Sequence, residues 1–99
     1  MPAAAPPAQT EASELNLSIE ISLYPLADDF IPAIDDVIAR FNQYADIDVA
    51  TSNTSTCLYG DYDRLMQVLA AEIKYSFEHY GRSVFVAKFI GRDVREPWQ

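Results

Sequence analysis

The clearest pattern in the chain is an alternation of aliphatic and polar residues between positions 15 and 24. Every odd position in this stretch is leucine or isoleucine. Successive side chains of an extended chain point to opposite sides, so the pattern predicts a strand with one aliphatic face that ends at Pro25. The opposite face would carry Asn16, Ser18, Glu20, Ser22 and Tyr24.

Two later segments repeat their apolar residues at the three- and four-residue spacing of an amphipathic helix. The first follows Asp28 and Asp29, which are candidate N-caps, and carries Pro32 in its first turn, where proline is tolerated. We expect this helix to end near residue 43 or 44. The second is expected to begin at Asp61, a good N-cap, and to end at Gly81. Four aromatic residues of these apolar stripes are expected in the core: Phe30, Phe41, Phe77 and Tyr80.

Two short β-like runs lie between the helices, and a third follows the second helix. The first two predict a hairpin that turns around residues 52–55, and residues 83–89 predict the last strand. The element order is therefore β-α-β-β-α-β. This order predicts an α+β, ferredoxin-like fold, in which a four-stranded antiparallel sheet carries both helices on one face.

The last predicted strand is apolar on both of its sides, with Val84 and Val86 on one and Phe85, Ala87 and Phe89 on the other. A strand of this kind usually has both sides covered, whereas the two helices cover only one face of the sheet. We therefore expect a second copy of the chain to pack on the open face, giving a homodimer.

Composition narrows the class of protein. Seven Lys and Arg stand against fifteen Asp and Glu, a net charge of −8, which disfavours nucleic acid as a partner. The single cysteine excludes an internal disulfide and fits a reducing compartment, so we expect a cytoplasmic protein.

Residues 1–14 offer nothing to bury and predict a disordered tail rather than a secretory signal. No segment is apolar enough to insert into a membrane. Residues 15–91 would then form the one domain, followed by a tail at 92–99.

Catalytic or metal chemistry finds little support in the sequence. The lone His79 lies at the end of a predicted helix, where a cation suits the helix dipole, and the lone Cys57 is expected to pack within a strand. No second Cys or His lies at metal-ligand spacing, and nothing indicates a cofactor.

The hydroxyl-rich run "TSNTST" at 51–56 is a better candidate for a functional site than these residues. It is either a polar hairpin or a set of neutral donors and acceptors suited to a small polar heterocycle, with alternate members on the open face near Ser22 and Tyr24.

Three segments together resemble the YkoF-like family of thiamine- and hydroxymethylpyrimidine-binding proteins. They are "ISLYPLADDFIPAIDDVI", "TSNTSTCLYGDYDRLMQVL" and "GRSVFVAKF". The resemblance runs from about residue 18 to residue 89. It implies a ferredoxin-like fold without enzymatic activity that binds thiamine or its pyrimidine moiety and serves thiamine-precursor uptake or salvage. Longer relatives carry two such repeats in one chain, and a homodimer of this single copy would restore the pair.

The resemblance and the hydroxyl pattern together select a set of candidate ligand-binding residues. They are Ser22, Tyr24, Asn53, Thr54, Ser55 and Thr56, with Asp28 and Asp29 as second choices. Two other classes of function stay open at this point. One is an enzyme on the same fold, for which the sequence offers only scattered carboxylates. The other is an interaction module that uses the open sheet face to bind another protein.

Overall fold

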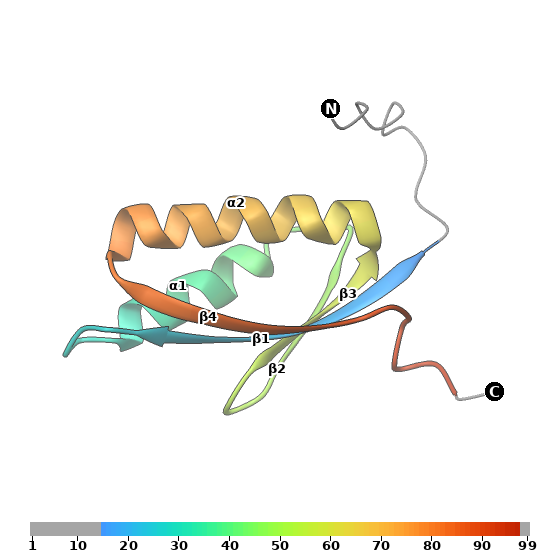
Figure 1. Cartoon of the computed structure of the whole chain (residues 1–99), viewed down its shortest axis with the longest axis horizontal. Helices are drawn as coiled ribbons and strands as arrows, with labels where there is room; N and C mark the ends of the chain where they lie inside the picture. Colours follow the sequence, from blue (N-terminus) through green and yellow to red (C-terminus); the bar gives the residue numbers. More distant parts are fainter. Residues whose placement is uncertain (1–14, 98–99) are drawn as a thin grey trace, which may run out of the picture.

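Both helices lie on one face of a single four-stranded antiparallel sheet, as the element order predicts (Figure 1). The computed structural model describes residues 15–97. The elements in chain order are β1 (Asn16–Pro25), α1 (Ile31–Phe41), β2 (Asp48–Thr51), β3 (Thr56–Asp61), α2 (Tyr62–Tyr80) and β4 (Ser83–Ile90). Across the sheet the strands follow the order β2-β3-β1-β4. The predicted ferredoxin-like arrangement is confirmed.

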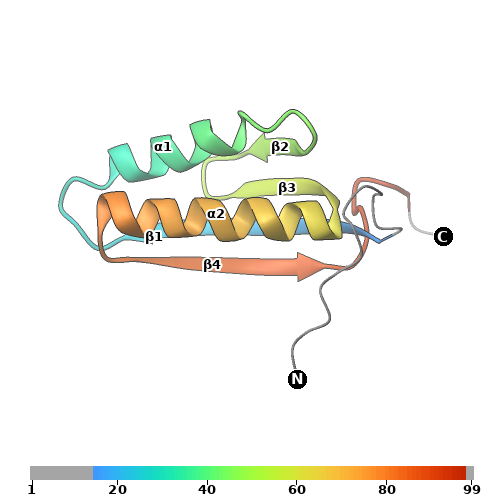
Figure 2. The ribbon, with the colours of Figure 1, turned by 90° about the horizontal axis from the view of Figure 1, so that it is seen from above.

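The core lies between the sheet and the two helices. Leu17, Ile19 and Ile21 of β1 are all buried on this side, as their alternation predicts. Ile19 lies directly opposite Leu58 of the neighbouring β3, and both side chains are fully buried. The largest buried side chain from α1 is Phe41, and α2 adds Leu65, Val68 and Leu69. Seen from above, α1 lies beside α2 on the side toward β2 (Figure 2).

The predicted ends of the second helix are confirmed. Asp61 caps α2 by accepting a hydrogen bond from the backbone N–H of Arg64 at 3.1 Å. Gly81 ends the helix with a φ of 77°, a conformation that glycine adopts without the strain a side chain would bring. The N–H of Gly81 then donates to the carbonyl of Phe77.

The predicted start of the first helix is wrong. Neither Asp28 nor Asp29 caps α1, whose N-cap is Phe30 without any side-chain hydrogen bond. Proline early in the first turn already lacks a backbone N–H, so there is less for a capping side chain to satisfy. The helix also ends at Phe41, earlier than expected.

Three of the four aromatic residues that were expected in the core lie at the surface instead. Phe30, Phe77 and Tyr80 are 47%, 44% and 37% exposed, whereas Phe41 is 1% exposed. Phe77 packs edge-on against Phe85 of β4, with ring centroids 5.5 Å apart. Because β4 is the last strand of the sheet, no further element among residues 15–97 covers this aromatic pair.

A buried carboxylate joins the two helices. Glu72 of α2 is 3% exposed, and its two oxygens accept hydrogen bonds from Arg40 at the end of α1 and from Tyr44 just beyond it. The hydrogen bond to Glu72 is the main cause that raises the pKa of Tyr44. The guanidinium of Arg40 also stacks on the ring of Tyr75, 3.4 Å from its centroid. The helix pair is therefore fixed by polar contacts as well as by apolar packing.

The C-terminal segment folds back over one end of the open sheet face. Ser18 Oγ donates to the carbonyl of Arg92 at 2.7 Å and accepts from the N–H of Val94 at 3.0 Å, which leaves Ser18 buried. Arg95 lies over the ring of Tyr59 at 4.1 Å and forms an ion pair with Asp48 at 3.0 Å. The segment that was expected as a tail thus covers part of the face that was expected to be open.

The predicted disorder of residues 1–14 lies outside the described residues. Within residues 15–97, no helix has the length and apolar character needed to cross a membrane.

We predict that Glu72→Ala lowers the free energy of unfolding by about 2 kcal/mol, because two charge-assisted hydrogen bonds across the helix pair are lost. Glu78→Ala is the matched control, since Glu78 lies on the same helix but is exposed. The control should change stability by less than about 0.5 kcal/mol. Urea denaturation followed by circular dichroism measures both values. Equal effects of the two substitutions would contradict the role given to Glu72.

Candidate ligand-binding site

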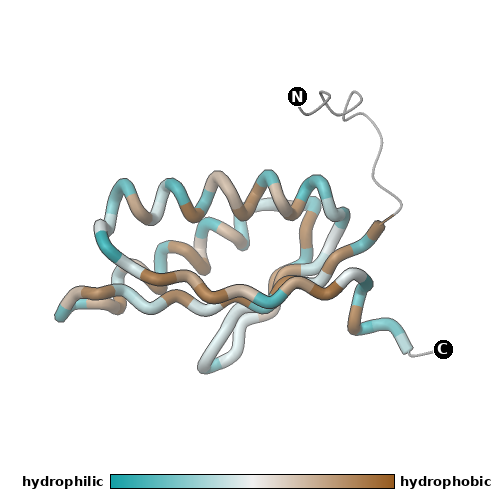
Figure 3. The backbone as a smooth tube through the Cα atoms, in the orientation of Figure 1, coloured by the Kyte–Doolittle hydropathy of each residue, from teal (hydrophilic) through white to brown (hydrophobic). Residues whose placement is uncertain are grey.

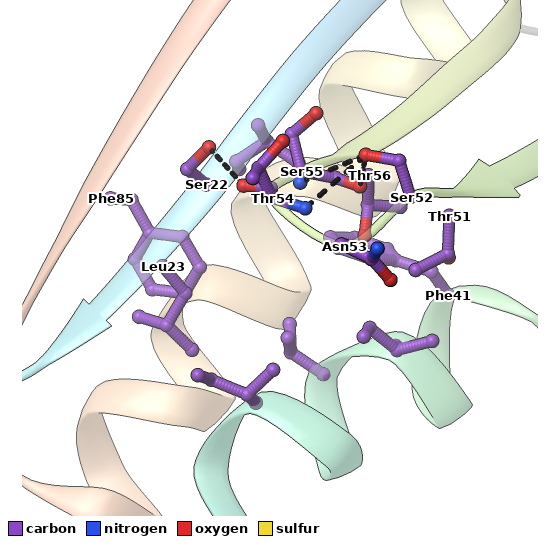
Figure 4. A pocket seen from close by; sticks show the side chains of 14 residues that line it. Ser22, Leu23, Phe41, Thr51, Ser52, Asn53, Thr54, Ser55, Thr56 and Phe85 are labelled. Atoms are coloured by element: carbon purple, nitrogen blue, oxygen red, sulfur yellow. Dashed lines mark hydrogen bonds between the residues drawn. The ribbon is translucent and has the colours of Figure 1, made fainter. Parts of the chain in front are cut away.

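A recess lies between α1 and the hairpin that joins β2 to β3, on the helix-covered side of the sheet (Figure 4). Its volume is about 100 Å³. Its floor is apolar and its rim is polar, and no titratable side chain lines it. The floor is made by Ile21, Leu23, Ile34, Val37, Ile38, Phe41 and Phe85, and the rim by Ser22, Thr51, Ser52, Asn53, Thr54, Ser55 and Thr56.

The hairpin turn is built around Ser52. Its backbone N–H donates to the carbonyl of Ser55 at 2.9 Å, and its hydroxyl oxygen accepts from the N–H groups of Thr54 and Ser55, both at 3.3 Å. Serine commonly supplies such local bonds, which take the place of backbone partners in a turn. No residue of the turn has a positive φ, so a chain without glycine can form it.

Two further bonds attach the hairpin to β1. Ser22 Oγ donates to the carbonyl of Thr54 at 3.1 Å, and Ser55 Oγ donates to Glu20 at 3.2 Å. Both partners lie on the strand adjacent to β3, so the tip of the hairpin is held beside the sheet. The polar rim is therefore formed before any ligand arrives, which lowers the ordering cost of binding.

The remaining polar side chains of the rim are available to a ligand. No hydrogen bond within residues 15–97 involves the side chain of Thr51, Asn53, Thr54 or Thr56. Thr56 is the most enclosed of them, at 6% exposed. A hydroxyl that has no partner within the chain can donate to a ligand and accept from it without giving up an internal hydrogen bond. The recess thus offers neutral donors and acceptors above an apolar floor.

The structure brings together most of the candidate residues. Ser22, Asn53, Thr54, Ser55 and Thr56 all line the recess. Tyr24, Asp28 and Asp29 do not line it: Tyr24 is exposed on the open face opposite Val84, and the two aspartates lie exposed in the loop before α1. That loop leaves the sheet at the far end of β1, beyond the point where the hairpin meets the strand.

The recess opens on the side of the sheet opposite to the one expected. Thr51 and Thr56 lie opposite each other in the hairpin, and Thr56 lies opposite Ile21, whose side chain points to the helices. The two threonines therefore belong to the helix-covered face, and only Ser55 reaches across to Glu20. The apolar floor was missed as part of a site, because helical spacing places Ile34, Val37 and Ile38 in the apolar stripe of the first helix and shows nothing about a recess beside it.

A second hollow, of about 260 Å³, lies on the open face where the C-terminal segment crosses it. Its lining includes Cys57, Tyr59, Val94 and the ion pair between Glu20 and Lys88, whose charged atoms are 3.6 Å apart. The hydroxyl of Ser18 there is already used by the C-terminal segment. The first recess is the better candidate, because it combines unpartnered polar groups with an enclosed apolar floor.

These features define a ferredoxin-like domain with a neutral recess at its β2–β3 hairpin. Residues 16–85 match the model of the YKOF-related family, and the chain belongs to this family. The match ends within β4, so the C-terminal segment that crosses the open face lies outside it. Among proteins with curated annotation, none matches this chain.

Several solved structures share the fold. A Streptococcus pneumoniae protein is 22% identical with a TM-score of 0.73, and the alignment covers 81% of this chain and 90% of that protein. A Methanocaldococcus jannascii protein is 24% identical with a TM-score of 0.69, over 82% of this chain and 84% of that one. A Thermotoga maritima protein provisionally assigned to thiamine biosynthesis or salvage is 16% identical with a TM-score of 0.69, over 75% and 81%. At sequence identities this low, the structural similarity to these proteins establishes only that the fold is shared.

We predict that Ser52→Ala speeds amide hydrogen exchange at Thr54 and Ser55, because their N–H groups lose the hydroxyl that accepts from them. Asn53→Ala is the control in the same turn, since the Asn53 side chain makes no hydrogen bond within the described chain. Exchange measured by NMR should rise several-fold in the first variant and stay unchanged in the second. An unchanged rate in Ser52→Ala would show that the turn is held by other contacts.

Proposed function

We propose that this protein binds thiamine or its hydroxymethylpyrimidine moiety without chemical turnover, and that it serves thiamine-precursor uptake or salvage. The observation that carries the proposal is the recess at the hairpin, which combines an apolar floor with unpartnered hydroxyl and amide groups. Membership of the YKOF-related family and the assignment of the Thermotoga maritima neighbour to thiamine metabolism support it.

The size of the recess favours the pyrimidine ring over the whole vitamin. An apolar cavity of about 150 Å³ holds a benzene ring, and this recess of about 100 Å³ is open on one side. A recess smaller than that admits at most one ring, with the ring substituents at its open side, and the second ring of thiamine would have to remain outside. We therefore assign the recess to the pyrimidine end of the ligand.

The lining suits an aminopyrimidine. The ring nitrogens accept hydrogen bonds, and the exocyclic amine donates them, so both match hydroxyl and amide side chains. Thr56 offers a hydroxyl on the most enclosed residue of the rim, and Asn53 at the rim has both a donor and an acceptor. The ring faces would contact the apolar floor, which includes Phe41 and Phe85.

Binding without catalysis agrees with the chemistry of the lining. No histidine, carboxylate or lysine lines the recess, and the carboxylate that accepts from the Ser55 hydroxyl, that of Glu20, lies outside it. Asp28 and Asp29 lie outside the recess, which weakens the enzyme hypothesis that depends on carboxylates.

The proposed assembly includes a second copy of the chain on the open face. Tyr24, Val84 and Val86 are each about half exposed there, at the end that the C-terminal segment leaves bare. A pure protein-interaction role would use this same surface and would need no ligand in the recess.

Titration calorimetry with hydroxymethylpyrimidine tests the proposal directly. We expect one site per chain, and we expect Thr56→Val to weaken binding about five- to tenfold, because an enclosed hydrogen bond to the ligand is lost while the side-chain shape is kept. Circular dichroism should show the same fold in the variant.

The matched control is the double substitution Asp28→Asn and Asp29→Asn, which should leave the affinity unchanged, since neither side chain lines the recess. Absence of heat and of any thermal shift with both hydroxymethylpyrimidine and thiamine would favour the interaction role. Binding that is insensitive to Thr56→Val and lost in Cys57→Tyr would place the ligand in the hollow of the open face.

Phosphorylated ligands should bind more weakly than neutral ones. The lining has no cationic side chain, and the chain carries a net charge of −8, so a phosphate gains no partner and meets a negative field. We expect hydroxymethylpyrimidine phosphate to bind at least about tenfold more weakly than hydroxymethylpyrimidine in the same titration. Equal or tighter binding of the phosphate would contradict the placement of the ligand in this recess.

A further inference from the structure

The hollow on the open face is a depression in a row of side chains that crosses the sheet. The register places Ser18 of β1 between Tyr59 of β3 and Ile90 of β4. Because serine is much shorter than its two neighbours, the sheet surface is low at this position. Val94 of the C-terminal segment closes one side, since its N–H donates to the Ser18 hydroxyl at 3.0 Å. The resulting hollow of about 260 Å³ exceeds the apolar cavity of about 150 Å³ that holds benzene.

The walls of this hollow are mainly apolar. Ile90 and Val94 both line it, and Val94 is the apolar exception in a C-terminal segment that is otherwise hydrophilic (Figure 3). Burial is the main cause that raises the pKa of Tyr59, so its phenol stays uncharged at neutral pH. An apolar group of a ligand that enters the hollow therefore exchanges water for apolar and uncharged neighbours, which favours binding.

An ion pair with unused hydrogen-bonding capacity lines the same hollow. Lys88 lies opposite Glu20 in the sheet, and its Nζ atom is 3.6 Å from Oε1 of Glu20, which is too far for a hydrogen bond. The ammonium of Lys88 makes no hydrogen bond to any of residues 15–97. Oε2 of Glu20 accepts from Ser55, whereas Oε1 accepts from nothing in the described chain. One ammonium and one carboxylate oxygen are therefore available to a ligand side by side.

We propose that this hollow binds a small apolar α-amino acid as a second ligand of the protein. The ammonium of the amino acid donates to Glu20 and its carboxylate accepts from Lys88, so both ions gain charge-assisted hydrogen bonds. Its side chain lies against Ile90 and Val94. A ligand that carries only one charge leaves the other member of the ion pair without a hydrogen-bond partner, so the site selects a zwitterion.

The hollow is distinct from the surfaces assigned above. It lies on the other face of the sheet from the recess, at the end of the open face away from Val84 and Val86. Lys88, Ile90 and Val94 lie beyond residue 85, where the match to the family ends. No charged side chain lines the recess, so the recess has no ionic partner for either end of an amino acid. This inference therefore does not depend on the proposed binding of hydroxymethylpyrimidine.

L-Leucine is the probe that tests the proposal, and two of its derivatives are the matched controls. Leucinamide lacks the carboxylate and N-acetylleucine lacks the ammonium, whereas all three share the apolar side chain. Leucine at up to about 10 mM should shift the amide NMR signals of Tyr59, Ile90 and Val94, and each derivative should bind at least about tenfold more weakly. Absence of these shifts, or equal binding of leucine and either derivative, would overturn the proposal.

Substitution of the lysine supplies an independent test. Lys88→Met keeps an unbranched apolar side chain but removes the charge, so leucine should bind at least about tenfold more weakly. Lys88 is 75% exposed, so the native circular dichroism spectrum should persist. Lys74→Met is the matched control, because Lys74 is exposed on α2, on the other face of the sheet, and it should leave leucine binding unchanged. Leucine binding that resists Lys88→Met, or that weakens equally in both variants, would show that the ion pair does not hold the ligand.

Discussion

The position of α1 depends on one buried carboxylate in α2. Glu72 accepts hydrogen bonds from Arg40 and Tyr44, and these bonds fix the end of α1 against the neighbouring helix. A carboxylate that is almost fully removed from water is stable only when its oxygens have partners, so this arrangement permits little sliding of one helix along the other. The floor of the recess is made largely by α1, through Ile34, Val37 and Ile38. The shape of the recess therefore depends on a contact at the C-terminal end of that helix.

The hairpin between β2 and β3 forms the side of the recess that faces α1. The polar residues of the rim divide into two groups with different roles. Ser52 and Ser55 of the hairpin and Ser22 of β1 hold the turn and attach it to β1. The other four keep their side-chain polar groups unused within the described chain; they are Thr51, Asn53, Thr54 and Thr56. Serine suits the first role because its short side chain reaches nearby backbone groups. Threonine suits the second, because its methyl group packs while its hydroxyl stays available.

The sequence predicts the fold well because its two periodicities are long and uninterrupted. The strict alternation over residues 15–24, most of which form β1, and the caps of α2 at Asp61 and Gly81 leave few alternative topologies. Most of the candidate site residues also follow from the sequence, since a hydroxyl-rich hairpin is a local feature. The face on which the recess opens does not follow, because it depends on the register between β1 and β3, which places Thr56 beside Ile21. The exposure of Phe77 and Tyr80 was missed for a similar reason: helical spacing shows which residues share a stripe, but it does not show how far the sheet extends beneath them.

The C-terminal segment gives the open face a property that a bare sheet would lack. Its attachment depends largely on Arg95, through the ion pair with exposed Asp48 and the contact with Tyr59, together with two bonds to Ser18. Exposed ion pairs weaken as dissolved ions screen them, whereas the apolar contacts of the core do not. Dissolved salt therefore loosens the hold of this segment on the sheet surface around Tyr59, as it weakens the other exposed ion pairs, Arg64–Asp46 and Lys88–Glu20, while the apolar core keeps its packing.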